Sequence, residues 1–241
     1  MIKVTVWNEY IHEKSDEKVR EIYPHGIHNY IKSFLDGEED FTVKAVSPDD
    51  PEHGLSDELL DNTDVLLWWA HIGHSKVPDD RAKKVVDRVL SGMGIIFLHS
   101  AHKSKPMMSL LGTTCSLAWR EGSRERLWCC NPSHPIAQGL PEHIEIPQEE
   151  MYGEHFDIPQ PEELVYLGWY KTGEVFRSVI TYTRGYGKIV YIQPGHETNP
   201  TYHIPEIQQL IKNAVRYAKP CVAVRPTLEC IGEPAPLENI K

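Results

Sequence analysis

The stretch GIIFLHSAH, residues 94–102, places reactive side chains directly after a short apolar segment. Its first five residues have the length and composition of a strand that is buried on both faces. The apolar run ends at His99, Ser100 and His102, whose side chains can act as bases, nucleophiles or metal ligands. We therefore predict a buried strand that ends at a functional site.

The segments before this strand alternate between strand-like and helix-like patterns. Strands are predicted at residues 2–7, 41–46, 64–70 and 94–98, and helices at 17–35, 56–62 and 78–92. Pro24 should divide the first helix, and Ser56 can cap the second. This alternation is typical of an α/β fold with a mainly parallel sheet and helices on both faces.

The second half of the chain contains strand-like segments in close succession. They are predicted at residues 124–130, 143–147, 164–170, 177–183 and 188–194, before a last helix at 204–218. The turn RGYG at 184–187 suits a hairpin, so we expect extra antiparallel strands at one edge of the sheet. The same strands leave a homo-oligomeric interface open as an alternative. We expect one domain over residues 1–218 and a Pro-rich tail over 219–241.

Composition and charge exclude several classes of protein. The 241 residues carry 35 acidic and 25 basic side chains, a formal charge of −10, without a basic cluster. We therefore expect no binding to nucleic acid or to a membrane. The apolar runs are too short for a membrane helix, and the first residues do not form a secretory signal. Five cysteines without a CxxC motif favour reduced thiols and a cytoplasmic protein.

Polar side chains follow each predicted parallel strand. In chain order they are Asn8, Glu9 and His12, then His71 and His74, then His99, Ser100 and His102, and finally His196 and Glu197. The segment EEMYGEHFD, 149–157, is either a solvated acidic loop or a further source of polar groups, namely Glu149, Glu150, Tyr152, Glu154, His155 and Asp157. Because parallel strands end at one rim, where such sheets bind ligands, we expect these groups to meet in one cleft.

The sequence resembles the ThuA-like (trehalose utilisation) family, which has the class I glutamine amidotransferase-like fold. The resemblance covers residues 4–202 in the stretches VTVWNEYIHEK, DVLLWWAHIGH, GIIFLHSAHKSK, GTTCSLAWRE, WCCNPSHPIAQGL, EEMYGEHFDIP, GEVFRSV and GYGKIVYIQPGHETNPTY. It implies a flavodoxin-like, doubly wound sheet. It also implies a carbohydrate ligand, such as a disaccharide or a keto-sugar.

The elbow of the amidotransferase-like fold is altered in this chain. That fold places a nucleophilic cysteine on a sharp turn after a strand, and a His–Glu pair near the end of the chain. His196 and Glu197 match the pair, whereas His99 and Ser100 occupy the elbow, where no cysteine is present. Glutamine hydrolysis through a thioester is therefore not expected.

Three kinds of chemistry remain open. Ser100 could be a nucleophile, with His196 as its base and Glu197 as the orienting acid. A divalent metal such as zinc could be bound, with His71, His99, Glu154 and His196 as candidate ligands. The histidines and glutamates could also perform metal-free acid–base chemistry on a sugar, through His99, Ser100, His196 and Glu197.

A non-catalytic sugar-binding or regulatory module is a fourth alternative. We expect a small-molecule carbohydrate as the ligand and no nucleotide cofactor. The candidate substrate-binding residues are Asn8, His12, Trp69, His74, Tyr152, His155 and Tyr202. Aromatic residues are included because sugar rings stack on aromatic faces. Trp68, which precedes Trp69, is a further aromatic residue near the predicted rim. The number of titratable groups favours a sugar-processing hydrolase, lyase or isomerase over a binder.

Overall fold

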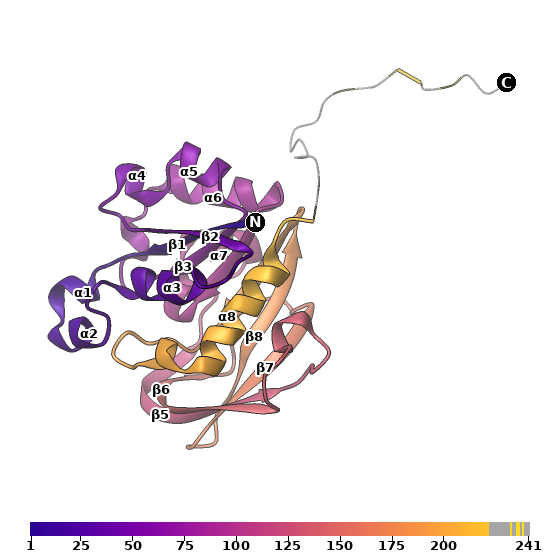
Figure 1. Cartoon of the computed structure of the whole chain (residues 1–241). Coiled ribbons are helices and arrows are strands. Elements are labelled where there is room, and N and C mark those ends of the chain that lie inside the picture. The colour runs from indigo at the N-terminus through magenta and orange to yellow at the C-terminus, as the bar shows by residue number, and fades with distance from the viewer. Residues whose placement is uncertain (222–231, 233–234, 237, 239–241) are drawn as a thin grey trace.

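Nine strands form one sheet in the order β2-β1-β3-β4-β9-β8-β7-β5-β6 (Figure 1). The structure, a computed structural model, describes residues 1–221, 232, 235–236 and 238. The strands are β1 Ile2–Asn8, β2 Phe41–Val46, β3 Val65–Trp69, β4 Gly94–Leu98, β5 Ala118–Cys129, β6 His143–Gly153, β7 Glu163–Tyr170, β8 Val175–Arg184 and β9 Gly187–Ile192. Most of the predicted tail, 219–241, lies outside the described residues.

The sheet has a parallel half and an antiparallel half. Strands β2, β1, β3, β4 and β9 pair in parallel. Strands β8, β7, β5 and β6 continue from β9 in antiparallel pairs, and β8 and β9 are joined by the predicted hairpin. The predicted fold, a mainly parallel doubly wound sheet with antiparallel additions, is confirmed.

Helices cover both faces of the sheet, and the longer ones have one apolar side. They are α1 His12–Ser15, α2 Glu17–Ile22, α3 Ile27–Leu35, α4 Pro51–Gly54, α5 Asp57–Asp61, α6 Asp79–Leu90, α7 Lys105–Leu111 and α8 Pro205–Ala218. Helices α3 and α8 pack into one apolar core, and α6 and α7 into the core on the opposite face. Figure 1 shows α3 and α8 side by side in front of the sheet.

Two local predictions explain the ends of the helices. The predicted helix at 17–35 is divided around Pro24 into α2 and α3, because proline cannot donate the backbone hydrogen bond of a continuous helix. Ser56 caps α5, where its hydroxyl oxygen accepts the Leu59 N–H at 3.2 Å.

The first five residues of the segment 149–157 belong to a strand, and only residues 154–157 form a loop. Strand β6 continues to Gly153, because β5 begins at Ala118 and pairs with it there; Trp119 lies opposite Tyr152. The pairing register shifts twice in β5, on either side of Ser123. These irregularities are of the kind that bend a strand and increase its twist. The long β5–β6 pair places Glu149 and Glu150 in the interior of the protein.

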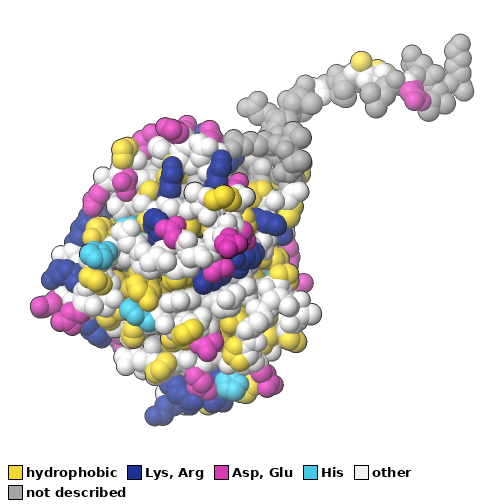
Figure 2. Space-filling view, in the orientation of Figure 1, with side chains coloured by type: hydrophobic (Ala, Val, Ile, Leu, Met, Phe, Trp, Pro, Cys, Tyr) yellow, Lys and Arg dark blue, Asp and Glu magenta, His cyan; other side chains and the backbone are white. Residues whose placement is uncertain are grey.

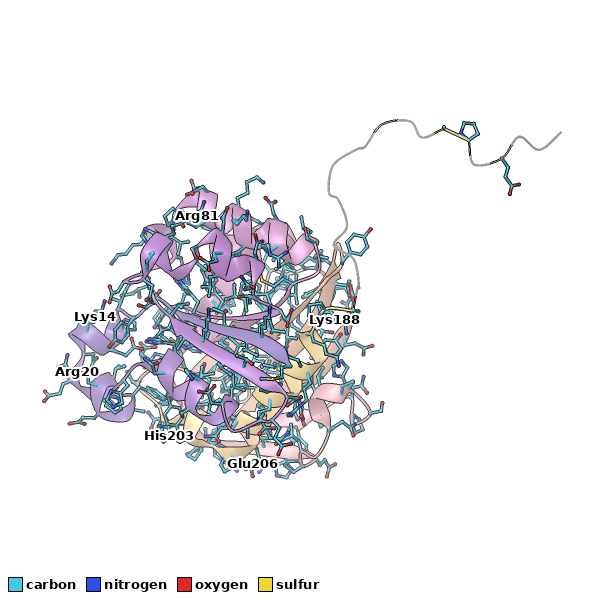
Figure 3. The ribbon with its side chains drawn as sticks, turned by 45° about the horizontal axis from the view of Figure 1, so that its top comes forward. Lys14, Arg20, Arg81, Lys188, His203 and Glu206 are labelled. Atoms are coloured by element: carbon cyan, nitrogen blue, oxygen red, sulfur yellow. The ribbon has the colours of Figure 1, made fainter. Side chains whose placement is uncertain are left out.

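Acidic and basic side chains are mixed on the surface. On the face in Figure 2, lysine and arginine side chains lie among aspartates and glutamates rather than in one basic patch. In the described part of the chain, no helix combines the length and apolar character needed to cross a bilayer. Figure 3 shows Lys14 and Arg20, from the α1–α2 segment, on a different side from Lys188, which lies at the amino end of β9.

Candidate functional site

The carboxyl ends of the parallel strands bring histidines and glutamates together. His12 follows β1, His71 follows β3, His99 follows β4, and His196 and Glu197 follow β9. The rings of His12 and His71 lie 5.1 Å apart, and those of His71 and His99 5.8 Å apart. The sheet therefore gathers groups from four distant parts of the sequence at one rim.

Glu197 is the central carboxylate of one cluster. Its Oε1 lies 3.0 Å from Nδ1 of His12 and 3.0 Å from Nδ1 of His71. Burial alone would raise the pKa of Glu197, but His12 and His71 outweigh it and hold that pKa far below the ordinary range. The nearby Glu197 carboxylate in turn raises the pKa of His12, although burial opposes this shift. Glu197 therefore stays ionised and favours protonation of its neighbour.

His99 and Glu150 form a second pair. His99 Nε2 lies 3.2 Å from Glu150 Oε2, and its Nδ1 donates to the carbonyl of Gln193 at 3.0 Å. His99 is completely buried and has a φ of +51°, which is uncommon for residues other than glycine. Burial lowers the pKa of His99, but the nearby carboxylates, Glu150 first, outweigh it and raise the pKa. A proton on His99 is therefore held next to Glu150.

His196 is held in its neutral form. Burial and then the charge of His99 lower its pKa to about 4. Its Nδ1 accepts hydrogen bonds from the backbone N–H of Thr198 at 3.2 Å and from the Thr198 hydroxyl at 2.8 Å. Since a neutral imidazole has one acceptor and one donor nitrogen, Nε2 carries the proton. His196 therefore presents an N–H, which lies 3.8 Å from Glu197 Oε1.

Glu149 holds the turn that carries His196 and Glu197. Its carboxylate accepts the backbone N–H groups of Gly195 at 2.8 Å and His196 at 3.0 Å, together with the Thr201 hydroxyl at 2.8 Å. Glu149 is completely buried. Charge-assisted hydrogen bonds of this kind are strong, so they fix the position of the turn.

Glu9 fixes the loop after β3 in the same manner. Its two carboxylate oxygens accept the backbone N–H groups of Ile72 at 3.0 Å and Gly73 at 2.7 Å. A Cβ atom on Gly73 would come within 2.8 Å of Glu9 Oε2, so a larger residue there would have to displace this carboxylate. The loop that presents His71 is thereby tied to the end of β1.

A cleft of about 320 Å³ opens over these groups. It is lined by His71, Ile72, His74, Ser100, His102, Lys103, Ser116, Leu117, Trp119, Glu150 and Tyr152. Glu150 and His71 reach the cleft directly, whereas His99 lies behind Glu150. Ile72 and Trp119 remain 57% and 62% exposed, which is unusual for large apolar side chains. The cleft therefore combines ionisable groups with an aromatic surface.

Several predicted substrate-binding residues line the cleft. His74 and Tyr152 do so, and His12 lies just behind, against Glu197. Ser100 also lines it, and its hydroxyl lies 2.7 Å from the Tyr152 hydroxyl. Asn8 is buried beneath the rim, where its amide group donates to Glu13 at 2.5 Å.

Other predicted residues lie away from the cleft. Trp69 is buried and its indole N–H donates to the carbonyl of Gly195 at 3.1 Å, so it supports the turn before His196. Tyr202 is also buried, directly beneath Gly195. Glu154 accepts two hydrogen bonds from the Arg177 guanidinium at 2.8 Å, and the exposed His155 follows it. These four side chains therefore do not face a ligand in the cleft.

The sequence analysis listed Glu150 among the polar groups of 149–157 without giving it a role, and it did not select Trp119. Both belong to quoted stretches of the sequence, but only the long β5–β6 pairing brings them to the rim. An alternating pattern over 149–153 could have indicated a strand there. No local signal marks Trp119, because its role depends on pairing with Tyr152.

Three overlapping groups of side chains have donor atoms close enough to hold a metal ion. They are His12, His71 and Glu197; His71, Glu150 and His196; and His99, His196 and Glu197. Within each group the donor atoms lie within 4.8 Å of one another. Glu154, predicted as a ligand, is in none of these groups.

The fold and the site define an amidotransferase-like α/β protein in which a histidine occupies the elbow after β4. The family model for trehalose utilisation, ThuA, matches residues 3–218. The chain belongs to the ThuA family. None of the curated proteins matches the sequence.

Solved structures from several bacteria share this fold. A ThuA-like protein from Parabacteroides merdae aligns with a TM-score of 0.66 at 15% identity, over 93% of this chain and 92% of its own. A cytoplasmic protein from Salmonella typhimurium aligns with a TM-score of 0.61 at 10% identity, over 91% and 100%. A glutamine amidotransferase from Thermotoga maritima aligns with a TM-score of 0.50 at 10% identity, over 90% and 97%.

Proposed function

We propose that the chain is a carbohydrate-processing enzyme in which Glu150, paired with His99, moves a proton to or from a sugar. The observation that carries this proposal is the arrangement of the pair. Glu150 lines the cleft, and the fully buried His99 lies 3.2 Å behind it, fixed by the carbonyl of Gln193. A carboxylate that faces the cleft can exchange a proton with a substrate, and a buried imidazole behind it can supply or accept that proton.

The family and the cleft support a carbohydrate as the substrate. A trehalose utilisation family indicates a disaccharide or a keto-sugar derived from one. Trp119 offers an exposed indole face on which a sugar ring can stack. A carbonyl on the sugar makes the neighbouring C–H acidic enough for a carboxylate or an imidazole to remove its proton. We place this reaction in the cytoplasm, because the pattern of cysteines favours it and a similar solved protein is described as cytoplasmic.

Two alternatives have less support from the arrangement of the cleft. A Ser100 hydrolase needs a base in contact with the serine hydroxyl, whereas the partner of Ser100 is Tyr152. A pure binding module needs amides and aromatic groups, whereas the centre of this site has four imidazoles and two carboxylates.

The test is a screen of trehalose, other disaccharides and their keto derivatives for turnover by the full chain. We expect activity on a keto-sugar, and a loss of about 100-fold or more in Glu150→Gln, the usual contribution of a general acid or base. Ser116→Ala, which alters an exposed residue lining the same cleft, should keep nearly full activity. Full activity in Glu150→Gln on a demonstrated substrate would reject the assignment.

A further inference from the structure

We propose that His12, His71 and Glu197 form a binding site for one divalent transition-metal ion, for which zinc is the best match. Two imidazoles and one carboxylate are a known ligand set of zinc. The three residues follow β1, β3 and β9, so the parallel sheet itself assembles the site. The metal site goes beyond the proposed proton transfer by Glu150 and does not depend on it.

The distances between the donor atoms suit a shared ion. Two ligand atoms at about 2.1 Å from a tetrahedral ion lie roughly 3.4 Å apart. Nδ1 of His12 and Nδ1 of His71 each lie 3.0 Å from Glu197 Oε1, so a small outward movement would admit the ion. His12 Nδ1 is enclosed and, despite this short distance, is not aligned for a hydrogen bond with any described group. A cation would therefore take the place of the proton that Glu197 favours on His12, without breaking a hydrogen bond of that nitrogen.

The hydrogen bonds of His196 indicate which of the three overlapping groups can hold the metal ion. His196 belongs to both of the other groups. Its Nδ1 already accepts the Thr198 N–H, which can only donate, so its proton is on Nε2. A protonated nitrogen has no lone pair for a metal. The group of His12, His71 and Glu197 is the one that does not require His196.

His99 is also left out of the proposed metal site, because both of its ring nitrogens already have partners. Its Nδ1 donates to the carbonyl of Gln193, which can only accept, and its Nε2 faces Glu150. The pair of His99 and Glu150 therefore remains intact when the ion is bound at His12, His71 and Glu197. Separate residues would then serve the metal and the proton transfer.

The proposed site is reached from the cleft through His71. Three protein ligands and a water molecule form the usual set of a catalytic zinc ion, whereas structural zinc has four protein ligands. His71 lines the cleft and its side chain is 24% exposed, so a sugar oxygen in the cleft can approach this group. The ion would polarise a carbonyl or hydroxyl oxygen of the sugar.

Metal binding can be measured without any sugar. The full chain, without an affinity tag and after treatment with a chelator, would be titrated with Zn²⁺ by calorimetry and with Co²⁺ by visible absorption. We expect one ion per chain. His71→Ala and Glu197→Gln should each weaken binding by about tenfold or more, because each removes a ligand or its charge. Circular dichroism would show that each variant is folded.

Two matched variants make the assignment specific. His74→Ala removes a histidine from the same loop and cleft as His71, and His196→Ala removes the neighbour of Glu197. Both should bind Zn²⁺ within about threefold of the unchanged chain. The absence of Zn²⁺ and Co²⁺ binding by the unchanged chain would overturn the proposal, as would a loss of binding in His196→Ala with full binding in His71→Ala. Because no substrate is used, this result is separate from the failure of the proposed sugar reaction.

Discussion

Glu150 Oε2 lies 3.2 Å from His99 Nε2, at the elbow where the amidotransferase-like fold carries its nucleophilic cysteine. The backbone keeps the turn, as the φ of +51° at His99 shows, but the side chain is turned into the interior and is completely buried. A buried imidazole cannot attack a substrate, whereas it can hold a proton for a carboxylate that lines the cleft. The turn of the fold is therefore retained, and the proposed function gives its histidine a role in proton transfer.

Replacing Ser100 separates proton transfer from nucleophilic catalysis. The hydroxyl of Ser100 pairs with Tyr152, and no described histidine is its hydrogen-bond partner. We expect Ser100→Ala to lower kcat by less than about tenfold, since loss of a nucleophile costs several orders of magnitude. Steady-state kinetics on the substrate from the screen would measure it. A fall of 1,000-fold or more would support a serine hydrolase instead.

Trp119 should bind the sugar without taking part in proton transfer. Its indole ring is 62% exposed at the cleft, and an aromatic contact contributes about 1 kcal/mol. Trp119→Ala should therefore raise the Kd for the sugar by roughly fivefold. Calorimetry would measure the Kd. Trp169→Ala, at a partly exposed tryptophan away from the cleft, is the matched control, and equal effects of both changes would contradict this role.

Glu149→Gln should destabilise the fold. The carboxylate accepts hydrogen bonds from Gly195, His196 and Thr201 in the interior, and an amide would place its own N–H groups against some of these donors. We expect a loss of roughly 3 kcal/mol in the free energy of unfolding. That corresponds to a fall in Tm of roughly 6–12 °C for a chain of this size. Denaturation with urea or heat would measure it.

The control for this change is Glu39→Gln. Glu39 is exposed, so its replacement should alter the free energy of unfolding by less than about 0.5 kcal/mol. Equal stability of the two variants would show that Glu149 does not hold the turn before Glu197.

The ion pairs of Arg216 should make stability depend on pH. Arg216 on α8 donates to Asp40 at 2.7 and 2.9 Å and to Glu38 at 2.6 Å, and these contacts lower the pKa of both carboxyls. A lowered pKa in the folded state stabilises the protein above the ordinary pKa near 4 and loses this effect as the pH falls below it. Because the groups are partly exposed, we expect about 1 kcal/mol at pH 7.

Arg216→Met tests this linkage. The variant keeps an apolar stem against Phe41, over whose ring the guanidinium lies at 4.7 Å. Its deficit in stability relative to the unchanged chain should be largest at pH 7 and should shrink between about pH 5 and pH 2. Urea denaturation at a series of pH values would measure it, and a deficit that grows in acid would contradict the assignment.

The fold could be predicted because the strands before residue 100 are short apolar runs separated by helical segments. Their polar ends predicted His71, His99, His196 and Glu197 at one rim, and the structure brings these four together. The direction of Trp69 could not be predicted, since a strand that is apolar on both faces has no alternation to show which side faces the cleft. The position of Glu150 at the rim could not be predicted either. It depends on the length of β6, which is set by the pairing of β6 with the distant β5.

Solvent exchange on a keto-disaccharide tests the central claim most directly. Proton nuclear magnetic resonance in D₂O would follow the C–H beside the sugar carbonyl during incubation with the full chain. We predict that the unchanged chain replaces this hydrogen with deuterium and that Glu150→Gln, with intact sugar binding, slows the exchange by about 100-fold or more. Sugar binding by the unchanged chain without exchange or turnover would contradict the account and would identify the cleft as a binding site alone.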